Sequence, residues 1–203
     1  MSAAPSRKPW PMKWVVLAIV VLIVPYTYLT LHYRKPGPAF RPYEDNKNRA
    51  TTVRLLSAGY QRVTLGLQRP ADPARGRASA EIAAAAGGVP AGLGAVLIDQ
   101  PLLPVSIDTV SAAGTTGAAQ PYPIQFTCTL ADNKAQLADG LLYHRGSELI
   151  VVPALEQLDN GLLARTRDST SVVTIPAGTL KPGNYTVTLI GARASRRWTL
   201  QVH

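Results

Sequence analysis

The chain has 203 residues, of which 46% are hydrophobic, and its 21 Lys and Arg against 12 Asp and Glu give a net charge of +9. Residues 1–49 hold eight of the basic and two of the acidic residues, so residues 50–203 are only weakly basic. A nucleic-acid surface needs a dense basic stripe with interleaved aromatic residues, and the later region lacks one, which argues against nucleic acid as a partner. With a single cysteine, Cys128, the chain forms no internal disulfide.

Residues 14–31, WVVLAIVVLIVPYTYLTL, hold no charged residue and follow a short basic tail, residues 1–13. A helix of this length is about 27 Å long, close to the roughly 30 Å of a bilayer's hydrocarbon core. The apolar run Ile19–Val24 covers every face of a helix, whereas a surface helix of a soluble protein is apolar on one side only. Tryptophans precede the run and tyrosines follow it, as at membrane interfaces. The sequence therefore predicts a single transmembrane helix.

A cleaved signal peptide is the main alternative, because Arg7, Lys8 and Lys13 precede an apolar core. The residues after Val24 are too bulky for a small-residue cleavage site, so we expect an uncleaved signal anchor in the cell membrane. Basic residues are more numerous after the helix than before it, which favours a cytoplasmic C-terminal region. The short basic tail and the β-rich body favour the opposite orientation, and we expect the body on the exported, periplasmic or extracellular side.

Residues 32–59 connect this helix to the body of the chain. Their first part, HYRKPGPAFRPY, is rich in proline and basic residues, which favours an extended stalk. The next part, EDNKNRATTVRLLSAGY, has acids at its start and Gly59 near its end, which favours a short helix near the membrane or capping the body. A polar linker that runs into a strand is the alternative.

The stalk also carries the candidate partner contact. Prolines restrict the free chain and so reduce the entropy lost on docking, while aromatic residues and arginine are favoured anchors at interfaces. The alternative is that the residues nearest the helix simply complete the membrane boundary. The candidate contact residues are Tyr33, Phe40, Arg41 and Tyr43.

The body, residues 60–203, begins with a predicted strand in YQRVTLGLQRP, where Val63, Leu65 and Leu67 alternate with other residues before Pro70. Residues 70–95 are rich in Ala, Gly and Pro, and we expect a flexible insertion there. Two turns of helix over Ala78–Ala86 are the alternative.

From residue 95 onward, short candidate strands alternate with turn-forming pairs, which is typical of an antiparallel sandwich or barrel. Asn160-Gly161 and Arg145-Gly146 are candidate hairpin turns, and the former has the stronger signal. The candidate strands are AVLI, PVSIDTV, IQFTCTL, LLYHR, ELIVVP, LLARTR, SVVTIP, NYTVTLIG and RRWTLQV.

The segment LKPGNYTVTL, residues 180–189, followed by RRWTLQV, resembles the closing strand pair of immunoglobulin-like and fibronectin type III-like sandwiches. The matching residues are Leu180, Pro182, Gly183 and Tyr185, and the resemblance covers about 25 residues without the Cys–Trp–Cys framework of antibody domains. It implies a mostly β fold, an antiparallel Ig-like β-sandwich after the single N-terminal helix. It also implies that Tyr185 and Trp198 are largely buried, with Val187 and Leu189 on the face of Tyr185.

Signatures of chemistry are missing from the sequence. His32, His144 and His203 have no further ligand at metal-binding spacing, and no nucleophile or metalloprotease motif is present. Alternation in IQFTCTL makes Cys128 a buried small hydrophobe, and Asp159 and Asp168 lie in turn-like stretches. We therefore expect no catalytic residue, metal, cofactor or small-molecule ligand.

The expected function is that of a membrane-anchored, non-catalytic protein-interaction module. It would be an accessory subunit or assembly component of a cell-envelope membrane complex, with the lipid bilayer and other membrane or envelope proteins as partners. An exported sensor or regulatory domain is the first alternative, although the tail before the helix is too short for a cytoplasmic output domain. An enzyme whose site is assembled from remote residues is the second. Function does not follow from a sandwich fold alone.

Overall fold

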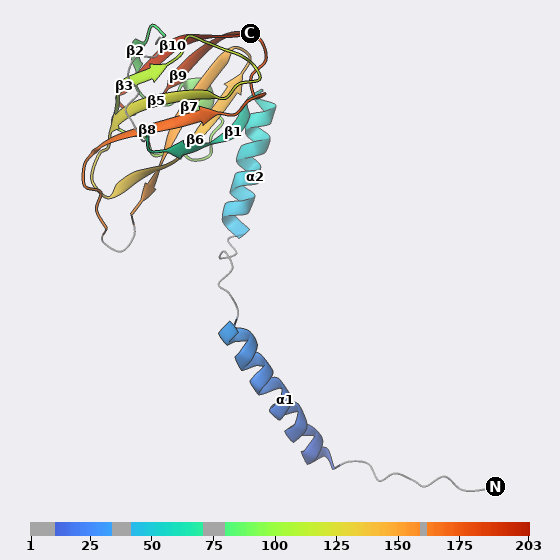
Figure 1. The fold of residues 1–203 in the computed structure, drawn as a ribbon. Helices are drawn as coiled ribbons and strands as arrows, with labels where there is room; N and C mark the ends of the chain where they lie inside the picture. Colours follow the sequence, from blue (N-terminus) through green and yellow to red (C-terminus); the bar gives the residue numbers. More distant parts are fainter. Residues whose placement is uncertain (1–10, 34–41, 71–79, 159–161) are drawn as a thin grey trace, which may run out of the picture. The chain divides into compact units, whose positions relative to one another are not determined.

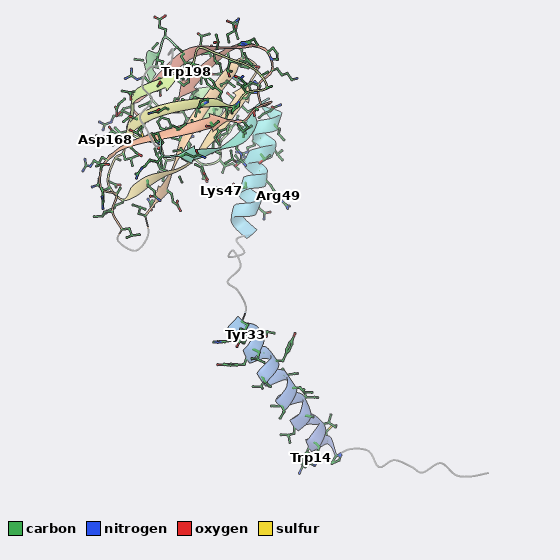
Figure 2. The ribbon with its side chains drawn as sticks, viewed as in Figure 1. Trp14, Tyr33, Lys47, Arg49, Asp168 and Trp198 are labelled. Atoms are coloured by element: carbon green, nitrogen blue, oxygen red, sulfur yellow. The ribbon has the colours of Figure 1, made fainter. Side chains whose placement is uncertain are left out.

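The computed structural model describes residues 11–33, 42–70, 80–158 and 162–203, and the chain divides into two compact units, Met1–Pro42 and Tyr43–His203. In the first unit, helix α1 spans Met12–Tyr33 and buries none of its side chains. Figure 2 shows Trp14 and Tyr33 at its opposite ends. By length and composition α1 is apolar enough to cross a membrane, which agrees with an anchor.

The second unit is a closed β-barrel (Figure 1). Eight of the ten described strands pair in the ring order β3–β5–β8–β1–β6–β7–β9–β10, with β10 pairing back to β3, while β2 and β4 pair with β10 outside this ring. Most pairs are antiparallel, but β7–β9 and β3–β10 are parallel. The strands are β1 (Gln61–Gln68), β2 (Ala83–Ala86), β3 (Ser106–Ala112), β4 (Thr115–Thr116), β5 (Tyr122–Thr129), β6 (Ala135–Arg145), β7 (Glu148–Gln157), β8 (Asp168–Ile175), β9 (Gly183–Leu189) and β10 (Ala194–Val202).

This ring corrects the expected Ig-like sandwich. The fold is mostly β, as predicted, but β9 pairs along one edge with β7 and along the other with β10. Backbone hydrogen bonds therefore continue where a sandwich would leave a gap between two sheets. Within the closing strand pair, the Tyr185 hydroxyl donates to the Lys181 carbonyl oxygen at 2.9 Å.

Alternating side chains fill the barrel interior. Along β5, every second residue is buried, which confirms the predicted alternation and places Cys128 inside. Tyr185 and Trp198 are 7% and 3% exposed, as predicted, and share the interior with Val187 and Leu189. The polar atoms inside are satisfied, since the Trp198 indole N–H donates to the Tyr122 hydroxyl, which donates to the Ala113 carbonyl oxygen. Burial raises the pKa of Tyr122 to about 12.

A second apolar cluster covers the outer face of β6 and β7. Helix α2, Pro42–Ser57, confirms the predicted short helix, and its Leu55 is buried against this face with Tyr60. The short helix α3, Ala91–Gly94, adds Leu93. Strand β7 is thus buried on both faces, which explains its unbroken apolar run.

The insertion at 70–95 differs from both sequence-based alternatives within its described residues. Ala83–Ala86 form strand β2, which pairs with Ala194–Arg197 of β10. Alanine is a poor strand former, but the edge of β10 supplies hydrogen-bonding partners that override this preference. The turn after β2 needs glycine, because a Cβ at Gly87 would lie 2.3 Å from the Arg193 carbonyl carbon. Residues 71–79 lie outside the described residues.

Of the two predicted hairpin turns, one can be checked against the structure. Arg145-Gly146, the weaker signal, lies in the turn between β6 and β7, with Gly146 at φ +60°. Asn160-Gly161 falls outside the described residues. The expected strands AVLI and LLARTR are not strands: Leu97 packs beside α3 in the outer cluster, and residues 162–167 precede β8 without joining the sheet.

Candidate functional site

The predicted stalk contact is only partly described. Tyr33 ends α1 and is 76% exposed. Phe40 and Arg41 lie outside the described residues, and Tyr43 belongs to α2 with its side chain outside them. This contact therefore remains a prediction.

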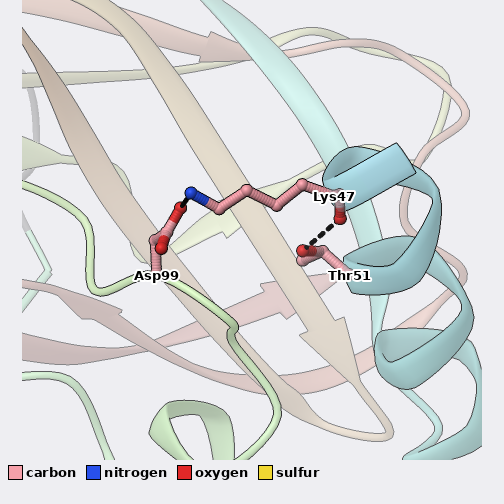
Figure 3. A network of polar contacts seen from close by, with 3 residues as sticks. All are labelled: Lys47, Thr51 and Asp99. Carbon is pink, nitrogen blue, oxygen red and sulfur yellow. Dashed lines mark hydrogen bonds and ion pairs between the residues drawn. The ribbon is translucent and has the colours of Figure 1, made fainter. Parts of the chain in front are cut away.

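Contacts on one side of α2 attach it to the barrel unit. Lys47 forms an ion pair with Asp99 on the loop after α3, while the Thr51 hydroxyl donates to the Lys47 carbonyl oxygen at 2.9 Å (Figure 3). One helical turn later, Leu55 is 1% exposed. The helix is thus part of the folded body, with its inner side fixed by a salt bridge and a buried leucine.

An apolar groove of about 270 Å³ lies where the segment before β3 meets the far end of the β6–β7 hairpin. We call it the leucine groove. Apolar side chains form most of its wall, and Asp132, Lys134 and Gln157 supply its polar groups. The apolar lining residues are Leu102, Leu103, Ala131, Ala135, Leu155 and Leu158.

Exposed leucines lie in this groove and at the same end of the barrel. Leu102 is 58% exposed, and Leu162 and Leu163 are 63% and 64% exposed. The latter two belong to the same end of the barrel, because the next residue, Ala164, donates its N–H to the Asn133 carbonyl oxygen at 2.7 Å. The Asn133 side-chain oxygen is buried without a hydrogen-bond donor among the described residues. An apolar centre with charged residues at its edge is the composition of a protein-binding surface.

A larger groove, of about 710 Å³, lies on the outer face of β3, β5 and β8. All of its lining residues are uncharged. The lining includes Ser111, Thr115, Gln120, Pro123, Val172 and Thr174. We call it the uncharged groove. It has room for a ligand or a peptide, and its lining contains no carboxylate, imidazole or amine.

Farther along the same face, two carboxylates share one hydroxyl. Thr129 Oγ1 lies 2.9 Å from oxygens of both Asp108 and Asp168, and Ser106 donates to Asp108 at 2.7 Å. Asp168 is the first residue of β8 rather than part of a turn, which corrects the sequence-based interpretation. Both carboxylates are exposed and accept hydrogen bonds from hydroxyl groups on neighbouring strands, so these bonds link β3, β5 and β8 at the surface.

The remaining candidates for chemistry have structural roles. Burial raises the pKa of the Cys128 thiol to about 12, and the carboxylates of Asp108 and Asp168 add to the shift, so no thiolate forms at neutral pH. His144 lies at the end of the β6–β7 hairpin, with Nε2 2.7 Å from the Gly146 carbonyl oxygen. Among the described residues, no three His, Cys, Asp or Glu side chains gather in a way that would hold a metal ion.

Reasoning from the sequence missed the leucine groove. Leu102 in the groove stands beside a proline without any periodic pattern, and Leu162 and Leu163 at the same end of the barrel fall within the expected strand LLARTR. The sequence offered one signal for these residues. Pairs of adjacent leucines stand among turn-forming residues, where neither strand nor helix periodicity predicts that they are buried in the core. Comparison with protein-family models, curated proteins and solved structures gives no match to this chain, so the grooves and surfaces of the chain itself carry the functional conclusion.

Proposed function

We propose that this protein is a membrane-anchored, non-catalytic interaction module, an accessory or assembly subunit of a cell-envelope membrane complex. Helix α1 is the anchor, and the barrel is the part that contacts other membrane or envelope proteins on the exported side. The observation that carries the proposal is the leucine groove with its exposed neighbours Leu102, Leu162 and Leu163.

Energetics supports a protein partner for this surface. Burying an exposed leucine fully stabilises a contact by about 1.5–3 kcal/mol, and several leucines together form the apolar centre that interfaces need. The barrel already has a filled interior and a covered β6–β7 face, so these leucines are not required for its own core. Asp132 and Lys134 at the edge of the groove provide charges that select the partner's orientation.

The stalk limits where that partner lies. Residues 34–41 join α1 to α2, and a chain of that length spans at most about 30 Å when fully extended. We propose that the barrel therefore meets its partner close to the membrane, where membrane-bound subunits are concentrated. Tyr33, Phe40, Arg41 and Tyr43 are proposed to add contacts within this layer.

Site-specific crosslinking in native membranes tests this proposal. A photo-crosslinking residue at Leu102 or at Leu163 is expected to give an adduct of the same size, because Leu102 lines the groove and Leu163 lies at the same end of the barrel. Thr199, which is exposed on β10, is the matched control and should give no such adduct. Adducts at all three positions, or at neither groove position, contradict the proposal.

The stalk needs a separate experiment. Replacing residues 34–41 with a Gly/Ser linker of equal length leaves α2 and its Lys47–Asp99 ion pair intact. If the stalk makes contacts, the swap weakens recovery of the crosslinked partner at Leu163 while the barrel stays folded. If recovery is unchanged, the stalk is only a spacer and the contact belongs to the barrel alone.

A second candidate function is favoured by the uncharged groove, whose volume of about 710 Å³ lies within the usual range of ligand pockets. In that case the barrel is a sensor for a small uncharged molecule. Native mass spectrometry of the gently extracted protein should then detect a bound molecule that a Val172→Trp variant lacks. A mass equal to that of the bare chain contradicts this second candidate.

A further inference from the structure

The outward side of α2 carries a stripe of exposed side chains. Arg49, Val53 and Leu56 follow at spacings of four and three residues, so they lie along one side of the helix. Val53 is 66% exposed and Leu56 is 61% exposed. Figure 2 shows Arg49 and Lys47 projecting from different sides of α2, and Lys47 is the one that pairs with Asp99. The stripe thus faces away from the contacts that hold α2 to the barrel.

The composition around this stripe suits an anionic lipid surface. Residues 34–57 hold six basic residues against two acidic ones, and Arg49 and Arg54 are exposed. Basic residues beside a membrane anchor are attracted to anionic headgroups, while aliphatic side chains on the same helix enter the boundary between headgroups and acyl chains. An anionic bilayer therefore complements both the charged and the aliphatic members of the stripe.

Tethering explains why so small a stripe suffices. Two aliphatic residues and one arginine would bind a bilayer only weakly from free solution. The short connection between α1 and α2 makes the encounter intramolecular, which raises the effective concentration of α2 at the surface.

We propose that α2 docks on the anionic surface of the membrane that holds α1, with Arg49, Val53 and Leu56 in the headgroup layer. The proposal rests on α1 as a membrane anchor, which is part of the proposed function. Lys47 and Leu55 attach the opposite side of α2 to the barrel. Docking of α2 therefore fixes the orientation of the barrel relative to the bilayer. The leucine groove is then presented in one orientation rather than in many.

An environment-sensitive fluorophore on single introduced cysteines tests this docking in the full-length chain. The three variants are Leu56→Cys on the stripe, Thr199→Cys on an exposed part of β10, and Leu22→Cys within α1. The native Cys128 is fully buried, so the parent chain should take up no label. Each labelled protein is reconstituted into phosphatidylcholine vesicles with or without phosphatidylglycerol.

The label at position 56 is expected to shift to the blue in phosphatidylglycerol vesicles, to shift less in phosphatidylcholine alone, and to return toward its aqueous spectrum at high salt. The label at position 199 should keep an aqueous spectrum throughout. Adding Arg49→Gln should reduce the shift at position 56, whereas Arg167→Gln, an exposed arginine before β8, should leave it unchanged.

Four other results overturn the proposal, and they point to different failures. An aqueous spectrum at position 56 with a lipid-like one at position 22 refutes docking while α1 remains an anchor. An aqueous spectrum at position 22 refutes the anchor itself, and the proposed function with it. Equal shifts at positions 56 and 199 indicate non-specific adsorption. Shielding of position 56 in native membranes but not in pure lipid assigns the stripe to a protein partner.

Discussion

The two outer faces of the barrel enclose the same interior but differ in what covers them. On β6 and β7, the outward residues Tyr143, Ile150 and Val152 are apolar and lie under α2 and α3. On β5 and β8, Thr127 and Thr170 point outward, with their hydroxyl oxygens 3.0 Å apart and half-buried. The β6–β7 face is therefore the base of a second apolar core. The β5–β8 face is an open surface on which these two hydroxyls are hydrogen-bonded to each other. The outward residue of each strand therefore decides whether a helix packs on it.

The interior shared by both faces should be the most sensitive region. Tyr185→Ala removes a buried ring from the barrel interior and is expected to cost about 3–5 kcal/mol of unfolding free energy, a large part of a domain's stability. Urea unfolding of residues 42–203, followed by circular dichroism, measures the loss. Tyr185→Phe keeps the ring and loses only the bond to Lys181, so it should cost about 1 kcal/mol. An unchanged midpoint for Tyr185→Ala would show that this corner does not hold the barrel together.

The comparison between the faces is tested most directly by one substitution on each. Ile150→Ala opens a cavity beneath α2 and should cost about 2–5 kcal/mol. Thr170→Ala on the open face removes one half-buried hydroxyl contact and should cost about 1 kcal/mol or less. Equal losses for the two variants would mean that the helical cover does not form a second core.

The turn that follows β2 should lose stability when a single methyl group is added. At Gly87 that group would meet the Arg193 backbone, so Gly87→Ala is expected to cost about 1–3 kcal/mol. Gly66 on β1 is the matched control, because no atom lies within 4 Å of an added Cβ there. Thermal unfolding of both variants should show a lower midpoint for Gly87→Ala only, and a lower midpoint for Gly66→Ala alone would contradict this packing.

The smallest expected effect concerns the ion pair that fastens α2. The side chains of Lys47 and Asp99 are 31% and 61% exposed, and pairs of this kind contribute about 0–1 kcal/mol. Lys47→Ala should therefore change unfolding only slightly, and less still at high salt. Leu55→Ala, which removes the buried contact of the same helix, should cost far more. If Lys47→Ala cost more than Leu55→Ala, the ion pair rather than apolar burial would hold α2 on the β6–β7 face.

Local patterns in the sequence predicted what local chemistry decides. Period-two alternation identified β5 with Cys128 inside, and the Pro-Gly-x-Tyr segment identified the buried Tyr185. Closure of the ring was not predictable in this way. Strand β9 pairs with β7 although β8 lies between them in the chain, and no local sequence pattern indicates such a pairing. The same holds for β2, whose alanines form a strand only because β10 lies beside them. The leucine groove was missed because its residues come from three separate segments.

Closing the sheet has a consequence for a protein that is held at a membrane surface, as we propose for this one. Anchored copies meet one another far more often than free ones, and an open sheet edge would give them a place to join strand to strand. Here the returning strand β10 is paired along one edge with β9 and the start of β3, and along the other edge with β2 and β4. Even the residues before this strand are paired, since Ala192 and Arg193 donate to the Pro104 and Val105 carbonyl oxygens. Among the described residues, β10 therefore offers neighbouring copies no free edge, and the short β2 is the outer strand at this place.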